Sequence, residues 1–297
     1  MTAREEGFLL LTSSLGNPDR KPLTIPQFRE LTRRMRQVDK PLHDGVLTEK
    51  DLLNIGLEPT FANRILTLLS QQEELRWYLE KGRKQDCYPL TRNNPAYPAI
   101  LRKRLQMEAP GVIWTKGDRE LLKMPAVALV GSRDLREENR DFAREVGKRA
   151  ALQGYALVSG NARGADKTAQ DSCLEHGGKV VVVLADQLEK HPLKRNVLYI
   201  AEEGFDLAFS ASRALQRNRV IHSLGMTTFV AQCTFEKGGT WDGTTKNLRH
   251  NLSPVACYND GSPAVNELAQ MGAIRVAKEE LADISALINI PTMHFNV

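Results

Sequence analysis

Two short loops that combine glycine with arginine are the residues of this sequence best suited to chemistry. The first is Gly131-Ser132-Arg133, and the second covers residues 159–166 with the sequence Ser-Gly-Asn-Ala-Arg-Gly-Ala-Asp. Each loop follows a short apolar run, where a glycine turn can point backbone N–H groups at phosphate. Arginine adds a fork of positive charge that fits phosphate oxygens, and Ser132 and Ser159 add hydroxyl donors, unless they only finish their strands. The pattern predicts a ligand that carries phosphate, either a nucleotide or a nucleic acid.

Within the second loop, three residue types have an expected task. Gly160 and Gly164 allow the close approach that a side chain would block, and Arg163 between them is free to point at a ligand. Asp166 is expected to be the N-cap of the next helix. An alternative is that Asp166 holds Arg163 or Arg133 in place.

A third segment, Arg217-Asn218-Arg219, adds positive charge downstream. It lies within residues 207–235, which contain three arginines and no acidic residue. A solvated helix face usually mixes both signs of charge, so this stretch indicates an anionic partner. We expect Arg217 and Arg219 to contact the ligand; the alternative is a structural role at the start of a helix.

The fourth segment is Gly238-Gly239-Thr240, which follows another apolar run. Two glycines and then a hydroxyl group form a candidate phosphate cradle. Trp241, the next residue, could stack on a base. The alternative is that its indole covers an edge of the core.

Several common chemistries have no motif here. The sequence lacks the dinucleotide fingerprint Gly-x-Gly-x-x-Gly, a Walker loop and a Gly-x-Ser-x-Gly nucleophile turn, and its six histidines show no metal-ligand spacing. We therefore predict no catalytic residue, no metal and no cofactor. A binding protein fits these residues better than an enzyme.

The bulk composition describes an ordinary water-soluble chain. Of its 297 residues, 41% are hydrophobic and 26% charged, with a net charge of +5 and a pI near 9.0. Four scattered cysteines without a Cys-x-x-Cys pair indicate a reducing compartment. No apolar run approaches the roughly 20 residues of a membrane span, and the N-terminus does not read as a signal peptide. We expect a cytoplasmic protein without a membrane partner.

From residue 125 onward, short apolar runs alternate with helical patterns. We expect strands at residues 126–130, 155–159, 180–184, 207–209, 227–231, 254–257 and 273–276, and helices at 137–153, 166–175 and 278–288. This alternation predicts the α/β class, with a mostly parallel sheet and helices on both faces. Parallel strands deliver their following loops to one edge, so the glycine–arginine loops should converge there.

The first third of the chain has a different pattern. Residues 23–37 and 59–81 have helical spacing of apolar residues, Thr24 and Thr48 are expected helix caps, and Gly82 is an expected helix stop. This predicts a small helical module that docks on the main domain. The alternative is a nucleic-acid reader of the helix-hairpin-helix type.

These patterns divide the chain into three parts. We expect a helical N-terminal domain over residues 1–86, a proline-rich linker over 87–124 and a Rossmann-like domain over 125–297. Within the linker, residues 111–117 read as a short strand, possible at the edge of the sheet.

Seven segments in order resemble the DNA-processing protein A (DprA/Smf) family over about residues 88–284. They are Tyr97-Pro-Ala-Ile-Leu101, Ala109-Pro-Gly-Val-Ile-Trp-Thr-Lys-Gly117, Val127-Ala-Leu-Val-Gly-Ser-Arg133, Val158-Ser-Gly-Asn-Ala-Arg-Gly-Ala-Asp166, Gly177-Gly-Lys-Val-Val-Val-Val-Leu184, Arg217-Asn-Arg-Val-Ile221 with Gly238-Gly-Thr240, and Gly261-Ser-Pro-Ala-Val-Asn-Glu-Leu268 with Gly272-Ala273. A single turn of this kind is weak support, but all of them in order are specific.

The resemblance implies an extended Rossmann-like domain preceded by a small helical domain. It implies single-stranded DNA in a basic pocket, a homodimer, and delivery of DNA to the RecA recombinase without catalytic turnover. The implied phosphate contacts are Arg133, Arg163, Arg217 and Arg219, with backbone support at Gly131, Gly160, Gly164 and Gly238.

The sequence departs from the family pattern in several places. The third strand ends in Ala185-Asp186 instead of a glycine turn, Leu215-Gln216 replaces Phe-Pro, Trp241-Asp242 alters the glycine loop, and Tyr258-Asn259-Asp260 replaces Pro-Gly. We expect no C-terminal winged-helix domain after the last helix. We therefore expect a divergent member, which acts either in recombinase loading or through an operon-encoded partner in phage defence.

Two other classes of function stay open. One is a nucleotide sensor or phosphoribohydrolase similar to the Lonely Guy proteins, with Gly239 to Thr244 as a loose match to their Gly-Gly-x-Gly-Thr turn and Asp242 as the acid. The other is an antitoxin-like module that binds a partner protein. Binding that depends on DNA strand length distinguishes the DNA-binding class from both.

Overall fold

The computed structural model describes residues 1–17, 19–37 and 47–288. Parts of the expected helical and Rossmann-like domains, residues 18, 38–46 and 289–297, lie outside that range. The contacts within the chain define two compact units. Unit 1 contains Met1–Tyr97, Pro110–Trp114 and Glu203–Phe205, and unit 2 contains Pro98–Ala109, Thr115–Glu202 and Asp206–Val297.

Unit 1 is mainly helical. Its elements are α1 (Ala3–Thr12), α2 (Ile25–Met35), α3 (Glu49–Asn54), α4 (Pro59–Ser70), α5 (Gln72–Arg83) and strand β1 (Tyr88–Thr91). The two helix starts expected at Thr24 and Thr48 are confirmed, because each threonine accepts a backbone N–H from the third residue beyond it, whose side chain accepts in return.

The single helix expected at residues 59–81 is wrong. Gln71, with ψ at 46°, leaves the helical region and separates α4 from α5. Gly82 is also not a stop, because α5 continues through Arg83. A Cβ at Gly82 would lie 2.9 Å from the Cys87 carbonyl oxygen and 3.0 Å from the Trp114 ring, so glycine is needed there for close packing.

Unit 1 has its own apolar core. Leucines from α1, α2, α3 and α4 meet Ala62 and Ile65 there, both fully buried. A second cluster stacks Tyr78, Trp114 and Phe205, whose ring centroids are 4.8–5.3 Å apart. These contacts give the helical unit a packed interior of its own.

Unit 2 is built on parallel strands. Among the described residues, the sheet has nine strands in the order β1-β2-β6-β5-β4-β3-β7-β8-β9, of which β1 and the first three residues of β2 are assigned to unit 1. The strands are β2 (Val112–Gly117), β3 (Ala126–Val130), β4 (Ala156–Ser159), β5 (Lys179–Leu184), β6 (Val197–Glu202), β7 (Thr228–Val230), β8 (Val255–Tyr258) and β9 (Ile274–Val276), besides β1. All pairs from β6 to β9 are parallel. The valines of β5 are buried, as expected for a strand covered on both faces. The predicted α/β class with a mostly parallel sheet is therefore confirmed.

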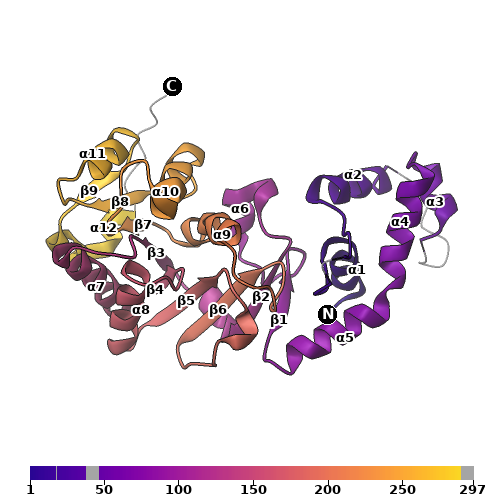
Figure 1. Ribbon diagram of the computed structural model, residues 1–297, viewed down its shortest axis with the longest axis horizontal. Coiled ribbons are helices and arrows are strands. Elements are labelled where there is room, and N and C mark those ends of the chain that lie inside the picture. The colour runs from indigo at the N-terminus through magenta and orange to yellow at the C-terminus, as the bar shows by residue number, and fades with distance from the viewer. Residues whose placement is uncertain (18, 38–46, 289–297) are drawn as a thin grey trace. The chain divides into compact units, whose positions relative to one another are not determined.

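Helices cover both faces of this sheet (Figure 1). α7 (Glu137–Leu152) and α8 (Ala165–Glu175) pack together on one face, and α9 (Ala211–Leu224) and α10 (Gly238–His250) lie together on the other. α6 (Ala99–Leu105), α11 (Pro263–Gln270) and α12 (Ile284–Ile288) complete the set. Within the part of the chain that the structure describes, none of the helices has the length and apolar character needed to cross a bilayer.

The sequence pattern missed two elements, and it placed three others in a way that differs from the structure. β6 and α6 were not foreseen, and β2 is no edge strand because it lies between β1 and β6. Residues 207–209 form no strand. The Arg213 guanidinium takes the carbonyl oxygens of Leu207 and Ala208, at 2.9 and 2.7 Å, so those acceptors serve a side chain instead of a ladder. The expected closing helix is a 3-10 helix over Lys278–Asp283 followed by α12.

The order of strands reverses at β3. Strands β4, β5 and β6 extend to one side of it, and β7, β8 and β9 to the other. In open parallel sheets, ligands bind outside the carboxyl ends of the strands at such a reversal. We therefore expect a ligand site at the loops that follow β3, β4 and β7.

Candidate functional site

The two glycine–arginine loops pack backbone against backbone. The Ala165 N–H donates to the Ser132 carbonyl oxygen at 3.2 Å. A Cβ at Gly164 would lie 2.3 Å from the Arg133 carbonyl oxygen, and Gly164 also has φ +85°. Only glycine satisfies both conditions, so it brings the loops after β3 and β4 into direct contact.

Asp166 organises the second loop from inside α8. It is not the N-cap, because Gly164 occupies that position and the helix begins at Ala165. Its buried carboxylate instead accepts the backbone N–H groups of Gly160 and Ala162, each at 3.1 Å. Burial raises the pKa of Asp166, and the nearby Arg217 opposes that shift. The carboxylate therefore fixes the loop that carries Arg163.

Arg217 is an almost fully buried positive charge. Its residue is 9% exposed, on the buried face of α9. A Cβ at Gly160 would lie 1.5 Å from its Nη1 atom, so the guanidinium rests directly on the glycine backbone. Among the described residues, its Nε and Nη1 atoms have no hydrogen-bond partner. Burial lowers the pKa of Arg217, while Asp166 works against that shift.

The other two loop arginines are exposed. Arg163 forms a 3.0 Å ion pair with Asp134, with both side chains more than three-quarters exposed. Arg133 lies near enough to Arg217 and Asp166 to act on both electrostatically. An exposed pair of this kind holds its members weakly, so Arg163 is available to a ligand.

Arg219 is already engaged. Two parallel hydrogen bonds of 2.8 and 2.7 Å join its guanidinium to Glu202, and Nε and Nη2 donate to the Glu108 carbonyl oxygen. Both side chains of the pair are mostly buried, at 19% and 11% exposed. Glu202 ends β6, the strand that the sequence pattern missed, so this partner was not foreseen.

The third and fourth segments meet through their helices. Residues 238–244 are not a loop, since α10 begins at Gly238 and places Gly239 and Thr240 in its first turn. The Asn218 side-chain amide donates to the Gly239 carbonyl oxygen at 3.1 Å. The free N–H groups of this first turn, rather than a cradle, are what the segment can offer an anion.

The two serine hydroxyls have partners inside the protein. Ser159 is buried and its Oγ accepts from the Gln170 amide at 2.5 Å. The Ser132 hydroxyl donates to the Gln232 carbonyl oxygen at 3.2 Å. Both hydroxyls therefore hold the loops in place through contacts within the chain.

A buried polar cluster, which the sequence reasoning did not single out, ties α9 to α10. His222 on α9 lies 3.2 Å from the Thr228 hydroxyl, and the Asn247 amide of α10 donates to its Nδ1 at 3.1 Å. Burial lowers the pKa of His222 to about 3, so the ring is neutral near pH 7. Its only sequence signal is a histidine within the apolar end of a helix.

A negative charge lies beside the arginines, at the end of β5. Asp186 forms a 3.1 Å pair with His191, whose hydrogen bond lowers the pKa of that carboxylate. Asp186 also acts on Arg217 electrostatically. Asp242, the acid of the phosphoribohydrolase alternative, pairs with Lys246 one turn further along α10, at 2.9 Å.

Comparison with known sequences gives a consistent family. A sequence model of the DNA recombination-mediator protein A family matches residues 89–288. The chain is 31% identical over 183 residues to the DNA processing protein DprA of Streptococcus pneumoniae, which covers 56% of this chain and 63% of that protein. It is 26% identical over 185 residues to protein Smf of Escherichia coli K12, covering 58% and 50%. The matched region thus spans about half to two-thirds of these relatives' lengths.

Solved structures share the fold. The X-ray structure of DprA from S. pneumoniae has a TM-score of 0.71 at 22% identity, covering 95% of this chain and 98% of that one. A DprA structure from Helicobacter pylori, reported for its single-stranded DNA binding mode, has a TM-score of 0.55 at 21% identity and covers 68% and 94%. At these identities the likeness establishes the Rossmann-like architecture.

Proposed function

Because this chain belongs to the DNA recombination-mediator protein A family, as the resemblance to DprA/Smf predicted, we propose that it binds single-stranded DNA at the carboxyl edge of its sheet. The H. pylori relative, DNA processing protein A, has a reported single-stranded DNA binding mode, which supports this choice of ligand. The proposed contacts are Arg133, Arg163 and Arg217, with backbone N–H groups from the two glycine loops and from the first turn of α10.

The observation that carries the proposal is the state of Arg217. A guanidinium that is nine-tenths buried, with two nitrogen atoms lacking partners among the described residues, costs about 1–3 kcal/mol in unmade hydrogen bonds. Asp166 offsets only part of the charge, because the same carboxylate also serves two backbone N–H groups. A phosphate bound beside Arg133 would supply the negative charge that Asp166 does not provide for Arg217.

The spread of the cationic groups favours a strand over a mononucleotide. Arg133 follows β3, Arg163 follows β4, and Arg217 comes from α9 on the opposite face. Three cations from separate elements suit successive phosphates of a backbone, which single-strand binders track with a positively charged groove. Arg219 would have to leave Glu202 to join them, so we place it in the supporting structure of α9.

We further infer that the protein acts without catalytic turnover, as a homodimer that passes the strand to a recombinase. The family description, a recombination mediator, supports a partner of this kind. The phage-defence role expected from the divergent sequence is a variant of the same proposal, with an operon-encoded partner in place of the recombinase.

The test is fluorescence anisotropy of a labelled single-stranded oligothymidylate at two salt concentrations. Binding should weaken with salt, since counterions are released from the phosphates. Arg133→Ala with Arg163→Ala should reduce affinity by about 10-fold or more and lower the salt slope by about two. The matched control is Arg33→Ala, an exposed arginine paired with Glu30 on α2. Equal affinity of the double variant and the control would refute the site.

A second candidate function rests on Asp186. A carboxylate next to Arg217 opposes phosphate, which favours the antitoxin-like module that binds a partner protein. Asp186→Asn separates the two candidates. If DNA binding is the function, the variant should bind the oligonucleotide more tightly, whereas a protein-binding module should bind DNA weakly with or without that charge.

A further inference from the structure

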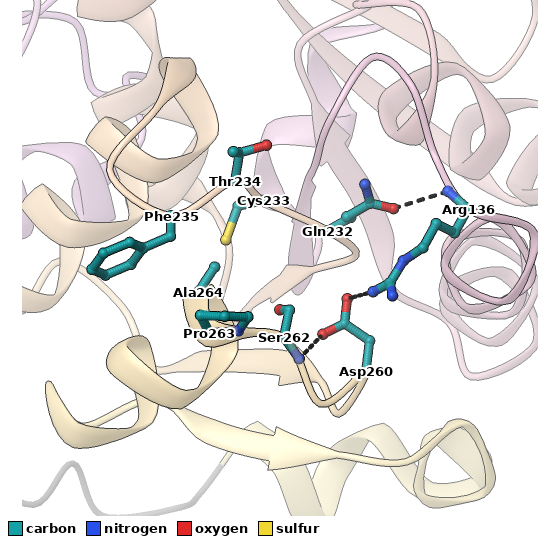
Figure 2. A pocket seen from close by; sticks show the side chains of 9 residues that line it. All are labelled: Arg136, Gln232, Cys233, Thr234, Phe235, Asp260, Ser262, Pro263 and Ala264. Carbon is teal, nitrogen blue, oxygen red and sulfur yellow. Dashed lines mark hydrogen bonds and ion pairs between the residues drawn. The ribbon is translucent and has the colours of Figure 1, made fainter.

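A hollow lies on the other side of β3 from Arg217. It has a volume of about 310 Å³ and is lined by the loops that follow β3, β7 and β8 (Figure 2). This is the position where the strand order reverses, the usual ligand crevice of an open parallel sheet. A volume at the low end of the 300–1,000 Å³ typical of ligand pockets suits one ring system.

One wall of the hollow is polar and fully satisfied. Figure 2 shows the Arg136 guanidinium bound to the Asp260 carboxylate, which also accepts the Ser262 N–H at 3.0 Å. The Asn139 amide donates to the same carboxylate at 2.8 Å. Burial alone would raise the pKa of Asp260, but these hydrogen bonds hold it below its usual value, so the group stays charged. A carboxylate here disfavours phosphate and leaves room for an uncharged group.

The opposite side is apolar and ends in an exposed aromatic ring. Cys233, Pro263 and Ala264 form its floor, and Phe235, 41% exposed, lies at its end (Figure 2). The Phe235 ring meets Trp241 edge-on, with centroids 5.1 Å apart and planes at 72°.

A tight turn holds this ring outward. The Lys237 N–H donates to the Thr234 carbonyl oxygen at 3.1 Å, and Glu236 has φ +54°. A residue other than glycine in the left-handed region is uncommon, which indicates that the surrounding contacts fix the turn. The turn therefore fixes the backbone from which Phe235 projects, and the contact with Trp241 supports one edge of its ring.

One residue joins the hollow to the proposed phosphate site. Gln232 lines the hollow, and its carbonyl oxygen accepts the Ser132 N–H at 2.9 Å. Its side-chain oxygen accepts the Arg136 N–H at 2.9 Å, and its amide donates to the Asp134 carbonyl oxygen at 3.2 Å. The loop that carries Arg133 is thus bound at three points to the wall of the hollow.

We propose that this hollow takes one base of the bound strand, stacked on Phe235, while the neighbouring phosphates lie on the arginines across β3. The inference rests on the proposed function and adds the subsite that distinguishes a DNA strand from a bare polyanion. The polar wall spends its hydrogen bonds internally, so the subsite accepts any base. Contact of this kind is made through the face of the ring, which all bases share.

The experiment compares a labelled oligothymidylate with an abasic oligonucleotide of the same length. Wild type should prefer the thymidylate by about 5- to 150-fold, the size of one base–aromatic stack. Phe235→Ala should lose this preference while keeping its affinity and salt slope for the abasic strand, and Phe235→Trp should retain it. The control is Phe209→Ala, which removes another exposed phenylalanine, 58% exposed and outside the hollow.

The outcomes separate this subsite from the proposed function. If wild type binds neither strand at low salt, the proposed function fails and the subsite fails with it. If wild type binds both strands and Phe235→Ala behaves like Phe209→Ala, the subsite is overturned while DNA binding stands. Competition by free thymidine monophosphate at concentrations that match the oligonucleotide would also overturn it, because the hollow would then be a mononucleotide site.

Discussion

An aspartate and an arginine lie together on each side of β3 at the same edge of the sheet, and the two pairs are built in opposite ways. Asp166 and Arg217 act on each other electrostatically, whereas Asp260 and Arg136 form a direct ion pair. On one side, Asp166 and Arg217 are both buried, and the guanidinium keeps two nitrogen atoms without partners in the described chain. On the other, the Asp260 side chain is 1% exposed and its carboxylate has three donors, while the Arg136 side chain remains half-exposed. In the first pair the guanidinium lacks hydrogen bonds among the described residues, whereas in the second pair the carboxylate has its hydrogen bonds satisfied.

We infer from this difference that Arg217 binds a ligand, whereas the pair of Asp260 and Arg136 only lines the hollow. A buried cation with unmade hydrogen bonds is stabilised when an anion binds, because the cost of its desolvation is already present in the folded protein. A pair with satisfied hydrogen bonds gains nothing from a charged ligand and only shapes the space beside it. We therefore expect phosphate on the Arg217 side of β3 and an uncharged ring on the Asp260 side.

The largest expected effect comes from removing the acid of each pair. Asp166→Ala leaves Arg217 buried without the negative charge that acts on it most strongly, and should lower the free energy of unfolding by about 3–5 kcal/mol. Asp260→Ala should cost less, about 1–3 kcal/mol, because water can reach the half-exposed Arg136. Urea denaturation of both variants measures the difference.

A matched control for these variants is available on α8. Asp171→Ala removes an exposed aspartate that pairs with Lys167, and it should change stability by less than about 1 kcal/mol. Equal losses in Asp166→Ala and Asp260→Ala would show that the two pairs do not differ in the way described.

The next effect tests the close approach at Gly160. Gly160→Ala places a methyl group where the Arg217 guanidinium now lies, so the arginine must leave its position. Such overpacking typically costs about 1–3 kcal/mol, and we expect single-stranded DNA affinity to fall by about 10-fold as well. Gly7→Ala, with open space around the new methyl group, is the control that should leave binding unchanged. DNA affinity retained in Gly160→Ala would remove Arg217 from the site.

The sequence predicted the frame of this site better than its contents. Apolar runs bounded by glycine identified β3, β4 and β5 and the convergence of their loops, because burial on both faces leaves a strong pattern. β6 was missed, and with it Glu202, the partner of Arg219. Whether an arginine is free or paired depends on which strands are neighbours, and a single sequence does not encode that order locally.

The hollow beside β7 is even harder to predict from the sequence. The sequence suggested that Trp241 could stack on a base, but Asp260 stood out only as a departure from the family pattern, and nothing in the sequence pointed to Phe235. The hollow depends on the loops after three strands meeting at the reversal point, which is a property of the topology. Asp166 shows the same limit, since its spacing suggested a helix cap while its tertiary position makes it the anchor of a loop.

A smaller effect should appear with pH, through the cluster that holds α9 against β7 and so joins the two sides. His222 has a pKa of about 3 when folded, against an ordinary value near 6.5. Between these values the unfolded chain binds more protons, so stability is complete above about pH 6.5 and falls as the pH drops. We expect a loss of about 1 kcal/mol between pH 7.5 and pH 5.5 in urea denaturation.

His222→Gln should flatten this pH dependence, although its stability at pH 7.5 will also be lower. The control is His250→Gln, an exposed histidine at the end of α10, which should keep the wild-type slope. A slope that persists in His222→Gln would assign the acid sensitivity to other groups.

The smallest expected change in stability separates binding from folding most cleanly. Arg163 and Asp134 are 76% and 89% exposed, so Arg163→Ala should alter the free energy of unfolding by less than about 0.5 kcal/mol. The same substitution should lower the salt slope of DNA binding by about one, the share of a single phosphate contact. Asp134→Asn should have the reverse effect on affinity, because the pair that competes with phosphate is lost. A salt slope unchanged in both variants would confine the proposed contacts to Arg133 and Arg217, and the strand would then cross the edge without touching the exposed loop.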